Sequence, residues 1–478
     1  MKAAPEWLVR SMDMLRGGSS SSAPDAAQRS MKQRLSATLR RGEEALSPKE
    51  LRKLMEDLQA ASSAQLSEVE AAKHAQAVMT WFAAASPQQR HDLWQLMSEQ
   101  FGPDAQRIEA ARLQLEKAQD AAQMTQAEIA LRKALVSART RLLQRFSVPE
   151  GGMRFLVDMR AQLLDLPKSD KRYVALDAEL EHLFSNWFDV AFLELRKLSW
   201  DSPASLLEKL IEYEAVHDIR SWADLKNRVD SDRRCYGFFH PKLPNEPLIF
   251  VEVALVDKMS DAIAPLLDEH GARADLNKAT TAVFYSISNT QTGLRGVSFG
   301  NSLIKRVVDD LLTEFPKLRH FATLSPIPGF RSWLLKNGDA LWAQLPAKQQ
   351  AAVQKVLGVT QPPTVSQWVE ACTDVQALGE QHVLRKTLMG CAAKYLVQGV
   401  DKGRPLDPVA RFHLGNGARV ERINWAADLS SKGMKQSLGL MVNYVYDLKR
   451  LDKHRSLLAQ GKVPASSEVQ AWYKDWQR

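Results

Sequence analysis

The sequence has few cysteines, and those it has form no recognisable framework. Cys235, Cys372 and Cys391 lie far apart, and none belongs to a Cys-x-x-Cys pair or sits beside two histidines. Disulfide scaffolds and cysteine-based zinc sites both need closely spaced ligands. The sequence therefore predicts a protein of a reducing compartment, with no structural zinc.

Long apolar runs and charge blocks of one sign are missing as well. No run approaches the roughly 18 apolar residues of a membrane span. The 64 lysines and arginines are scattered among 56 acidic residues, whereas a nucleic-acid surface usually gathers basic residues into a stripe. We therefore expect neither a membrane nor a nucleic acid as partner. No secretory signal and no peroxisomal tripeptide is recognisable, which predicts a cytoplasmic protein.

The length of 478 residues favours at least two domains, because single cores stop growing at roughly 250 to 300 residues. The Gly/Ser-rich stretch RGGSSSSAPDA predicts a flexible tail over residues 1–27. Residues 28–190 show no convincing strand but several helix starts. Ser47 followed by Pro48, and Ser86 followed by Pro87, each combine a capping hydroxyl with a proline at the first helical position. This segment is predicted to be an all-α bundle.

Residues 191–478 have a different pattern, in which β-rich runs alternate with helical ones. The runs are PLIFVEVAL (247–255), TTAVFYSIS (280–288), HFATLS (320–325) and ARVERINW (418–425). A helix with one apolar and one acidic face is predicted over about 300–315. The overall fold class is thus α+β, an N-terminal helical bundle followed by an α/β domain that we expect to carry the chemistry.

A glycine loop precedes that helix and has two functional interpretations. Residues 296–300, Gly-Val-Ser-Phe-Gly, match the Gly-x-Ser-x-Gly elbow of serine hydrolases, with Ser298 as nucleophile and His413 as its base. Residues 295–300 also suit a loop whose N–H groups bind a phosphate together with the next helix. An α/β-hydrolase needs several βα units before its elbow, and almost everything before residue 230 is helical, so the phosphate loop is favoured. A tight turn with glycines needed only for packing is the third possibility.

Ser325 is a candidate because the segment TLSPIPGF holds it at the start of a stiff bend. Pro326 and Pro328 fix the backbone there and remove two donors. The preceding strand follows the glycine loop by about one βα unit, and the carboxyl ends of parallel strands open onto one edge, where ligands bind. Capping of the proline turn is the structural alternative for this serine.

His413 lies in RFHLGNGARVERINW, just before Asn416-Gly417, the signal of a hairpin turn. Its apolar neighbours Phe412 and Leu414 predict a strand on which the histidine faces the opposite side from them. A structural role for a lone histidine is the alternative to a catalytic one.

Several longer blocks resemble those of the malonyl-CoA decarboxylase family. They are RRCYGFFHPKLPNEPLIFVEVAL, YSISNTQTGLRGVSFGNSLIKRVVDDLLTEFP, TLSPIPGF, FHLGNGARVERINWAADLS and GLMVNYVYDL, and they cover most of residues 185–450. The resemblance implies a GNAT-like catalytic domain that binds coenzyme A as part of its substrate and uses no metal or organic cofactor. It implies conversion of malonyl-CoA to acetyl-CoA and CO2. A GNAT-type acyltransferase, or a serine hydrolase using Ser298, is the alternative function.

The resemblance also implies roles for individual residues. It assigns the catalytic roles to Ser325 and His413, and the shaping of the acyl pocket to Ser286 and Tyr446. The residues it implies for coenzyme A binding are Arg295, Gly296, Val297, Ser298, Phe299, Gly300 and Asn301. Some relatives carry glutamate at the position of Ser298. A homo-oligomer, dimer or tetramer, assembled through the helical domain is expected.

Overall fold

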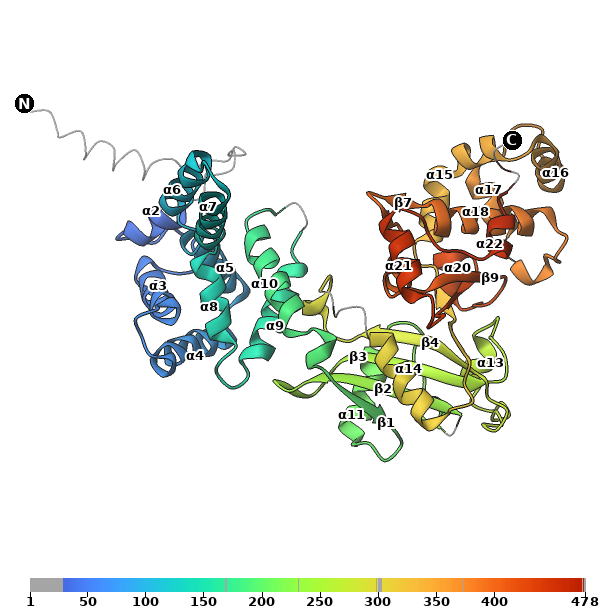
Figure 1. The fold of residues 1–478 in the computed structure, drawn as a ribbon, viewed down its shortest axis with the longest axis horizontal. Coiled ribbons are helices and arrows are strands. Elements are labelled where there is room, and N and C mark those ends of the chain that lie inside the picture. Colours follow the sequence, from blue (N-terminus) through green and yellow to red (C-terminus); the bar gives the residue numbers. More distant parts are fainter. Residues whose placement is uncertain are drawn as a thin grey trace, which may run out of the picture. The chain divides into compact units, whose positions relative to one another are not determined.

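The computed structural model describes residues 29–167, 170–230, 232–297, 299, 303–372, 374–474 and 476 (Figure 1). These residues form two compact units. The first takes in the described residues up to Pro149 and those from 170 to Leu176. The second takes in the described residues from Glu150 to 167 and from Asp177 onward. The segment predicted as one helical bundle, 28–190, is therefore shared between the two units.

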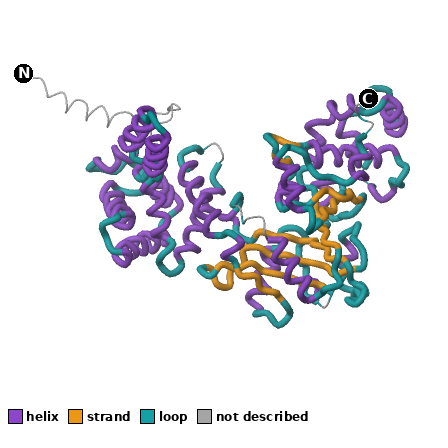
Figure 2. Tube along the Cα trace, in the orientation of Figure 1, coloured by secondary structure: helices purple, strands orange, loops and turns teal. Residues whose placement is uncertain are grey.

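The first unit is built from helices alone (Figure 2). Its elements are α2 (Met31–Ser36), α3 (Pro48–Ser62), α4 (Glu68–Ala84), α5 (Pro87–Gln100), α6 (Ala105–Lys117), α7 (Ala121–Ala134) and α8 (Ala138–Phe146). Both predicted proline starts are confirmed, since Ser47 and Ser86 form capping boxes with Glu50 and Gln89. Helix α10 (Val174–Trp187) begins in this unit and continues into the second.

The second unit contains α9 (Gly152–Leu164), most of α10 and an eight-stranded sheet. The strand order is β1-β2-β3-β4-β5-β10-β6, with β9 paired to β10. The strands are β1 (Glu194–Leu198), β2 (Arg233–His240), β3 (Leu243–Val256), β4 (Thr281–Asn289), β5 (His320–Thr323), β6 (Ser325–Pro326), β9 (Arg419–Asn424) and β10 (Met441–Val445). All four predicted β-rich runs are strands. Strands β4 and β5 are parallel, as predicted, so their carboxyl ends meet at one edge.

Helices cover both faces of the sheet. Helix α14 (Leu303–Glu314) lies on the face of Tyr236, whose hydroxyl donates to Asp310 at 2.8 Å. The neighbouring Cys235 faces the other way and packs in a cluster with residues of α11 (Ala204–Tyr213) and α12 (Trp222–Arg228). Figure 1 shows α14 crossing the strands.

The chain after β6 adds further helices and a small two-stranded ladder. The helices are α15 (Phe330–Gln344), α16 (Ala347–Leu357), α17 (Val365–Ala371), α18 (Val383–Gln398), α19 (Pro408–Gly415), α20 (Ser431–Ser437), α21 (Leu451–Ala459) and α22 (Ser467–Ala471); the short helix α13 (Ala264–Leu267) lies earlier, between β3 and β4. The ladder pairs β7 (Val400–Asp401) with β8 (Arg404–Pro405).

The predicted fold class, a helical N-terminal region followed by a domain with a mixed sheet, is confirmed. The strand expected around His413 is wrong, because this residue lies in α19. Asp407 accepts from two backbone N–H groups at the start of that helix, and Pro408 occupies its first position. This start signal outweighs the apparent alternation of polar and apolar residues.

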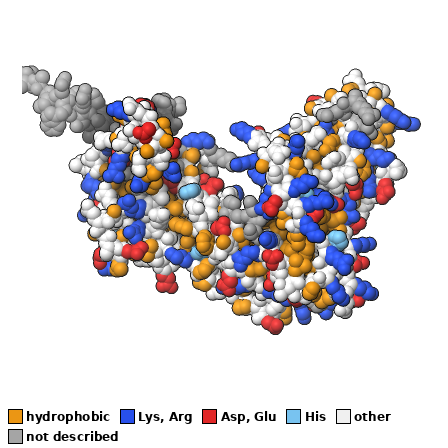
Figure 3. Space-filling model, in the orientation of Figure 1, with side chains coloured by type: hydrophobic (Ala, Val, Ile, Leu, Met, Phe, Trp, Pro, Cys, Tyr) orange, Lys and Arg blue, Asp and Glu red, His pale blue; other side chains and the backbone are white. Residues whose placement is uncertain are grey.

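The surface carries mixed charge. Figure 3 shows blue and red side chains interspersed over the visible face, as the scattered sequence positions predict. Within the ranges that the structure describes, no helix combines the length and the apolar composition needed to cross a membrane.

Candidate functional site

Ser325 stands where the sheet ends. It follows β5 directly and pairs with Val442 of β10, while Pro326 pairs with Met441. Strand β6 is the last in the order, and an edge position tolerates a proline because the missing N–H faces no partner strand. The predicted stiff bend then leads into α15 at Phe330.

Three of the sequence-predicted residues meet in one hydrogen-bonded chain. Ser325 Oγ lies 3.1 Å from His413 Nε2, and His413 Nδ1 lies 2.7 Å from the hydroxyl of Tyr446. All three side chains are buried. Ser325 belongs to β6, His413 to α19, and Tyr446 follows β10. The fold thus brings together Ser325 and Tyr446, which are 121 residues apart in the chain.

The hydrogen-bond directions define the state of the histidine. Ser325 donates its proton to Thr323 Oγ1 at 2.9 Å, so its oxygen acts as acceptor toward His413 Nε2. In this arrangement of the serine hydroxyl, Nε2 would carry the ring proton and Nδ1 would accept from Tyr446. Burial lowers the pKa of His413 to about 3, which keeps the ring neutral. Thr323 was not predicted from the sequence, although it stands two residues before Ser325.

Aromatic rings hold His413 in place. The Tyr444 ring stacks on it with centroids 4.7 Å apart and planes 27° apart, and Phe412 meets it edge-on at 5.1 Å. The Tyr446 ring meets the ring of Phe284 in β4 edge-on, with centroids 6.4 Å apart. The hydroxyl of Tyr444 is buried and has no hydrogen-bond partner among the described residues. Aromatic rings thus pack against the imidazole, and its two nitrogens meet Ser325 and Tyr446.

The glycine loop lies between β4 and α14, as predicted. Of its seven candidate residues, Arg295, Gly296, Val297 and Phe299 are described, whereas Ser298, Gly300 and Asn301 lie outside the described residues. A short 3-10 turn, η2 (Thr292–Leu294), leads into the loop. Gly296 has φ of 84°, in the left-handed region that favours glycine.

Residues from the helical segment hold this loop. The guanidinium of Arg160 in α9 donates to the carbonyls of Gly293 at 2.8 Å and Arg295 at 2.9 Å. The N–H of Val190 donates to the carbonyl of Phe299 at 3.0 Å. A Cβ added to Gly293 would lie 1.9 Å from the carbonyl oxygen of Val157. The backbones of α9 and η2 are therefore too close at this point for any side chain at position 293.

Ser286 is not brought to this chain of hydrogen bonds. The β3–β4 register shifts so that Phe284 pairs with Val253 but Ser286 pairs with Glu252, which places Ser286 on the face opposite to Phe284. There its hydroxyl donates to the carboxylate of Glu214 at 2.7 Å. A bulge of this kind leaves no mark in the sequence pattern, so the strand run alone does not predict which face Ser286 occupies.

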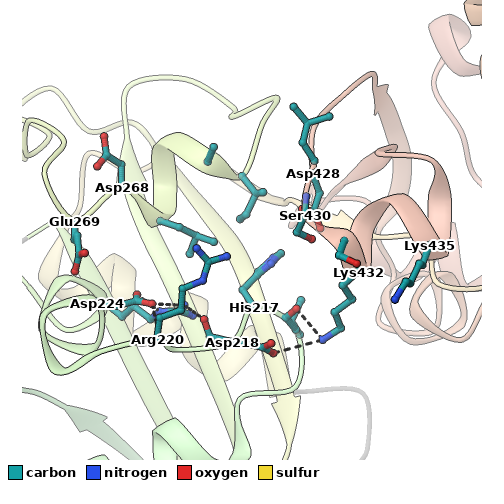
Figure 4. A pocket seen from close by; sticks show the side chains of 17 residues that line it. His217, Asp218, Arg220, Asp224, Asp268, Glu269, Asp428, Ser430, Lys432 and Lys435 are labelled. Carbon is teal, nitrogen blue, oxygen red and sulfur yellow. Dashed lines mark hydrogen bonds and ion pairs between the residues drawn. The ribbon is translucent and has the colours of Figure 1, made fainter. Parts of the chain in front are cut away.

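A cavity of about 740 Å³ lies beside Glu214 (Figure 4). The carboxylate of Glu214 also accepts the N–H of His217, which ties the cavity wall to β4. His217 points into the cavity, and its Nε2 has no hydrogen-bond partner within the described chain. Burial lowers its pKa to about 4. Arg228 and Lys432 also line the cavity, together with the acids Asp218 and Asp428.

The sequence and fold match known proteins over most of the chain. The family models described as "Malonyl-CoA decarboxylase C-terminal domain" and "Malonyl-CoA decarboxylase N-terminal domain" match residues 191–477 and 101–188. The mitochondrial malonyl-CoA decarboxylase of Mus musculus is 38% identical over 408 residues, covering 80% of this chain and 82% of the relative. That of Anser anser anser is 36% identical over 412 residues, covering 81% of each.

Solved structures agree with these relatives. The crystal structure of malonyl-CoA decarboxylase from Rhodopseudomonas palustris superimposes with a TM-score of 0.75 at 39% identity, over 88% of this chain and 99% of that one. The corresponding structure from Cupriavidus metallidurans gives 0.72 at 45% identity, with the same coverage.

Proposed function

This chain belongs to the malonyl-CoA decarboxylase family, and from that premise we propose how its own residues convert malonyl-CoA to acetyl-CoA and CO2. The observation that carries the proposal is the buried chain Ser325–His413–Tyr446. Decarboxylation breaks the bond between the carboxylate and the α-carbon, and the electron pair moves into the thioester carbonyl as an enolate. The α-carbon must then receive one proton.

Ser325 is the group that hands over this proton. Its hydroxyl turns from Thr323 toward the α-carbon, and as its proton leaves, the Nε2–H of His413, 3.1 Å away, restores it. His413 Nδ1 takes the proton of Tyr446 in the same movement. Burial raises the pKa of Tyr446, so a lasting tyrosinate is unfavourable. The proton transfers along the relay are therefore coupled to the return of one proton from solvent to Tyr446.

The same hydrogen bonds argue against Ser325 as a nucleophile. In a serine hydrolase the histidine accepts the serine proton, whereas here Nε2 is the donor and the serine proton points to Thr323. Positioned donors near a developing enolate and general acid assistance are each typically worth roughly 10²-fold or more. The proton delivery proposed for Ser325 is the general-acid part of this assistance.

The glycine loop is proposed to bind the coenzyme A pyrophosphate. Its support is the position after a parallel strand and before α14, the positive φ of Gly296, and the engagement of the Gly293 and Arg295 carbonyls by Arg160. Gly296→Asp should raise KM for malonyl-CoA by charge repulsion. Gly296→Asn is the matched control, since Asn tolerates positive φ without adding charge. Equal KM values for the two variants would place the cradle elsewhere.

The reaction type is tested by incubating the protein with malonyl-CoA and identifying the products by mass spectrometry, with and without an amine acceptor. Acetyl-CoA and CO2 in equal amounts are expected. A malonylated amine would indicate an acyltransferase instead, and free coenzyme A with malonate would indicate a hydrolase.

The role of the histidine is tested by His413→Asn. We expect kcat to fall by roughly 10²-fold or more, since the relay loses its central member, while the affinity for coenzyme A changes less than about twofold. His454→Asn is the control, because His454 is another buried histidine of the same unit, with Nδ1 3.0 Å from the carbonyl of Gly417. A similar kcat loss in both variants would show a packing effect and contradict the relay.

The cytoplasmic location and the oligomeric state stay predictions. The relatives compared above are named as mitochondrial.

A further inference from the structure

Arg160 of α9 has an unusual set of contacts for a residue of a helical segment. Its side chain is 1% exposed, and it makes four polar contacts. Two go to the carbonyls of Gly293 and Arg295, and two to the carboxylates of Asp177 at 2.8 Å and Glu181 at 3.3 Å. The planar fork of a guanidinium can satisfy such a set, whereas an ammonium cannot.

The two backbone contacts bear on the direction of the loop. A carbonyl oxygen turned toward a diphosphate repels it, and a backbone N–H attracts it. Arg160 holds the carbonyls of Gly293 and Arg295 at α9, on either side of Leu294 and directly before the positive φ of Gly296. With these two oxygens engaged, the Arg295–Gly296 peptide plane is fixed. The N–H groups of Leu294, Arg295 and Val297 donate to carbonyls within the turn, so over residues 294–297 the N–H of Gly296 is the donor left to meet a ligand.

The two carboxylate contacts bear on the charge beside the loop. The Glu181 carboxylate lies so close that a Cβ added to Gly296 would be 3.8 Å from one of its oxygens. A carboxylate next to an anion site weakens binding, and because the Asp177 and Glu181 side chains are 33% and 46% exposed, solvent screens part of this repulsion. Arg160 pairs with both and offsets their charge.

We propose that Arg160 is a positioning residue for coenzyme A: it orients the glycine loop and neutralises the acids beside it without touching the ligand. The proposal rests on the proposed pyrophosphate role of this loop. Arg160, Asp177 and Glu181 all fall in the segment that the N-terminal family model matches, residues 101–188. The helical segment therefore contributes to substrate affinity, not only to assembly.

The test uses the full chain with Arg160→Met and Arg160→Lys. KM for malonyl-CoA and Kd for coenzyme A should rise by about tenfold to hundredfold in the Met variant, the usual range for losing charge-assisted hydrogen bonds. The Lys variant should recover part of this, and kcat at saturation should stay within about twofold of the wild type. Arg139→Met is the matched control, because Arg139 is also buried and also donates to backbone carbonyls, those of Met97 and Ser98, in the other unit.

Adding Glu181→Gln to Arg160→Met isolates the electrostatic part. This double variant should bind coenzyme A more tightly than Arg160→Met alone. Unchanged affinity in the double variant would remove the charge argument, and unchanged KM in Arg160→Met would overturn the proposal as a whole. A loss of kcat and of thermal stability equal to that of Arg139→Met, with KM preserved, would show that Arg160 is only structural.

A malonyl thioester of pantetheine, which lacks the pyrophosphate, separates this proposal from the one it rests on. The wild type should prefer malonyl-CoA to it by kcat/KM, and the Arg160→Met variant should lose most of that preference while turning over the short thioester normally. If the wild type shows no preference, the pyrophosphate role of the loop is wrong. If the wild type shows it and Arg160→Met retains it in full, the role of Arg160 is wrong.

Discussion

Replacing Tyr446 by phenylalanine removes the hydroxyl at the end of the proposed relay. That hydroxyl lies 2.7 Å from His413 Nδ1, to which it donates in the proposed relay, and both groups are buried. The ring itself keeps its contact with Phe284, so the variant changes hydrogen bonding and little else. The imidazole then has a buried acceptor without a partner, which costs about 1 to 3 kcal/mol.

The same free energy sets the expected kinetic effect. If the relay passes through Tyr446, the lost interaction is felt in the transition state, and kcat falls roughly 5- to 150-fold. KM for malonyl-CoA should stay within about twofold. The assay is steady-state formation of acetyl-CoA from malonyl-CoA, combined with urea unfolding of each variant.

Tyr444→Phe is the matched control two residues away on the same segment. Its ring stacks on His413 as well, but its buried hydroxyl has no partner in the described structure, so its removal should leave kcat and the free energy of unfolding nearly unchanged. Equal kcat losses in the two variants, or normal turnover in Tyr446→Phe, would refute the reasoning.

Three further changes test neighbouring parts of the account. Thr323→Val removes the acceptor that orients the Ser325 hydroxyl, so kcat should fall by about tenfold, whereas Thr323→Ser keeps an acceptor and should keep kcat. Equal kcat values for the two variants in steady-state assays would exclude that role. The pKa values of His413 and His217 are lowered by burial to about 3 and 4, so the folded state binds fewer protons than the unfolded chain below pH about 6.5. Stability is therefore complete above that pH and lost as pH falls toward 4, which urea unfolding between pH 7 and 5 measures; a flat profile would contradict the burial of neutral imidazoles. Gly293→Ala brings a Cβ against the carbonyl of Val157, so the melting temperature should fall and KM for malonyl-CoA should rise; an unchanged KM would show that α9 does not shape the loop.

Much of the fold follows from local sequence signals. The capping serines with their prolines mark the helix starts in the first unit, and the β-rich runs mark the strands, because capping and strand formation depend on neighbouring residues. The parallel pairing of β4 with β5 also follows from the order of strand, glycine loop, helix and strand.

The parts that escaped prediction depend on contacts between distant residues or on backbone irregularities. The helix around His413 is set by Asp407 and Pro408, whose start signal the neighbouring Asn-Gly pair obscured. The face of Ser286 is set by a register shift that composition does not encode. Arg160 lies 133 residues from the first carbonyl it binds, and nothing in its helical surroundings marks it.

The sequence pattern and the resemblance singled out Ser325 and His413 as a catalytic pair and Tyr446 as a residue of the acyl pocket, and the structure adds that the three side chains form one hydrogen-bonded chain. The neutral imidazole with its proton on Nε2 follows from the position of Thr323, which orients the serine hydroxyl. The proposed proton delivery, as opposed to nucleophilic attack, depends on this direction of the serine hydroxyl.

The most direct test of the proton relay is the turnover of malonyl-CoA by Ser325→Ala, measured as acetyl-CoA formed at saturating substrate, with Kd for coenzyme A measured on the same preparation. The relay predicts a kcat lowered by roughly 10²-fold or more with Kd changed less than about twofold, because the serine hydroxyl acts on the α-carbon and not on the nucleotide. Near-normal kcat in this variant would contradict it.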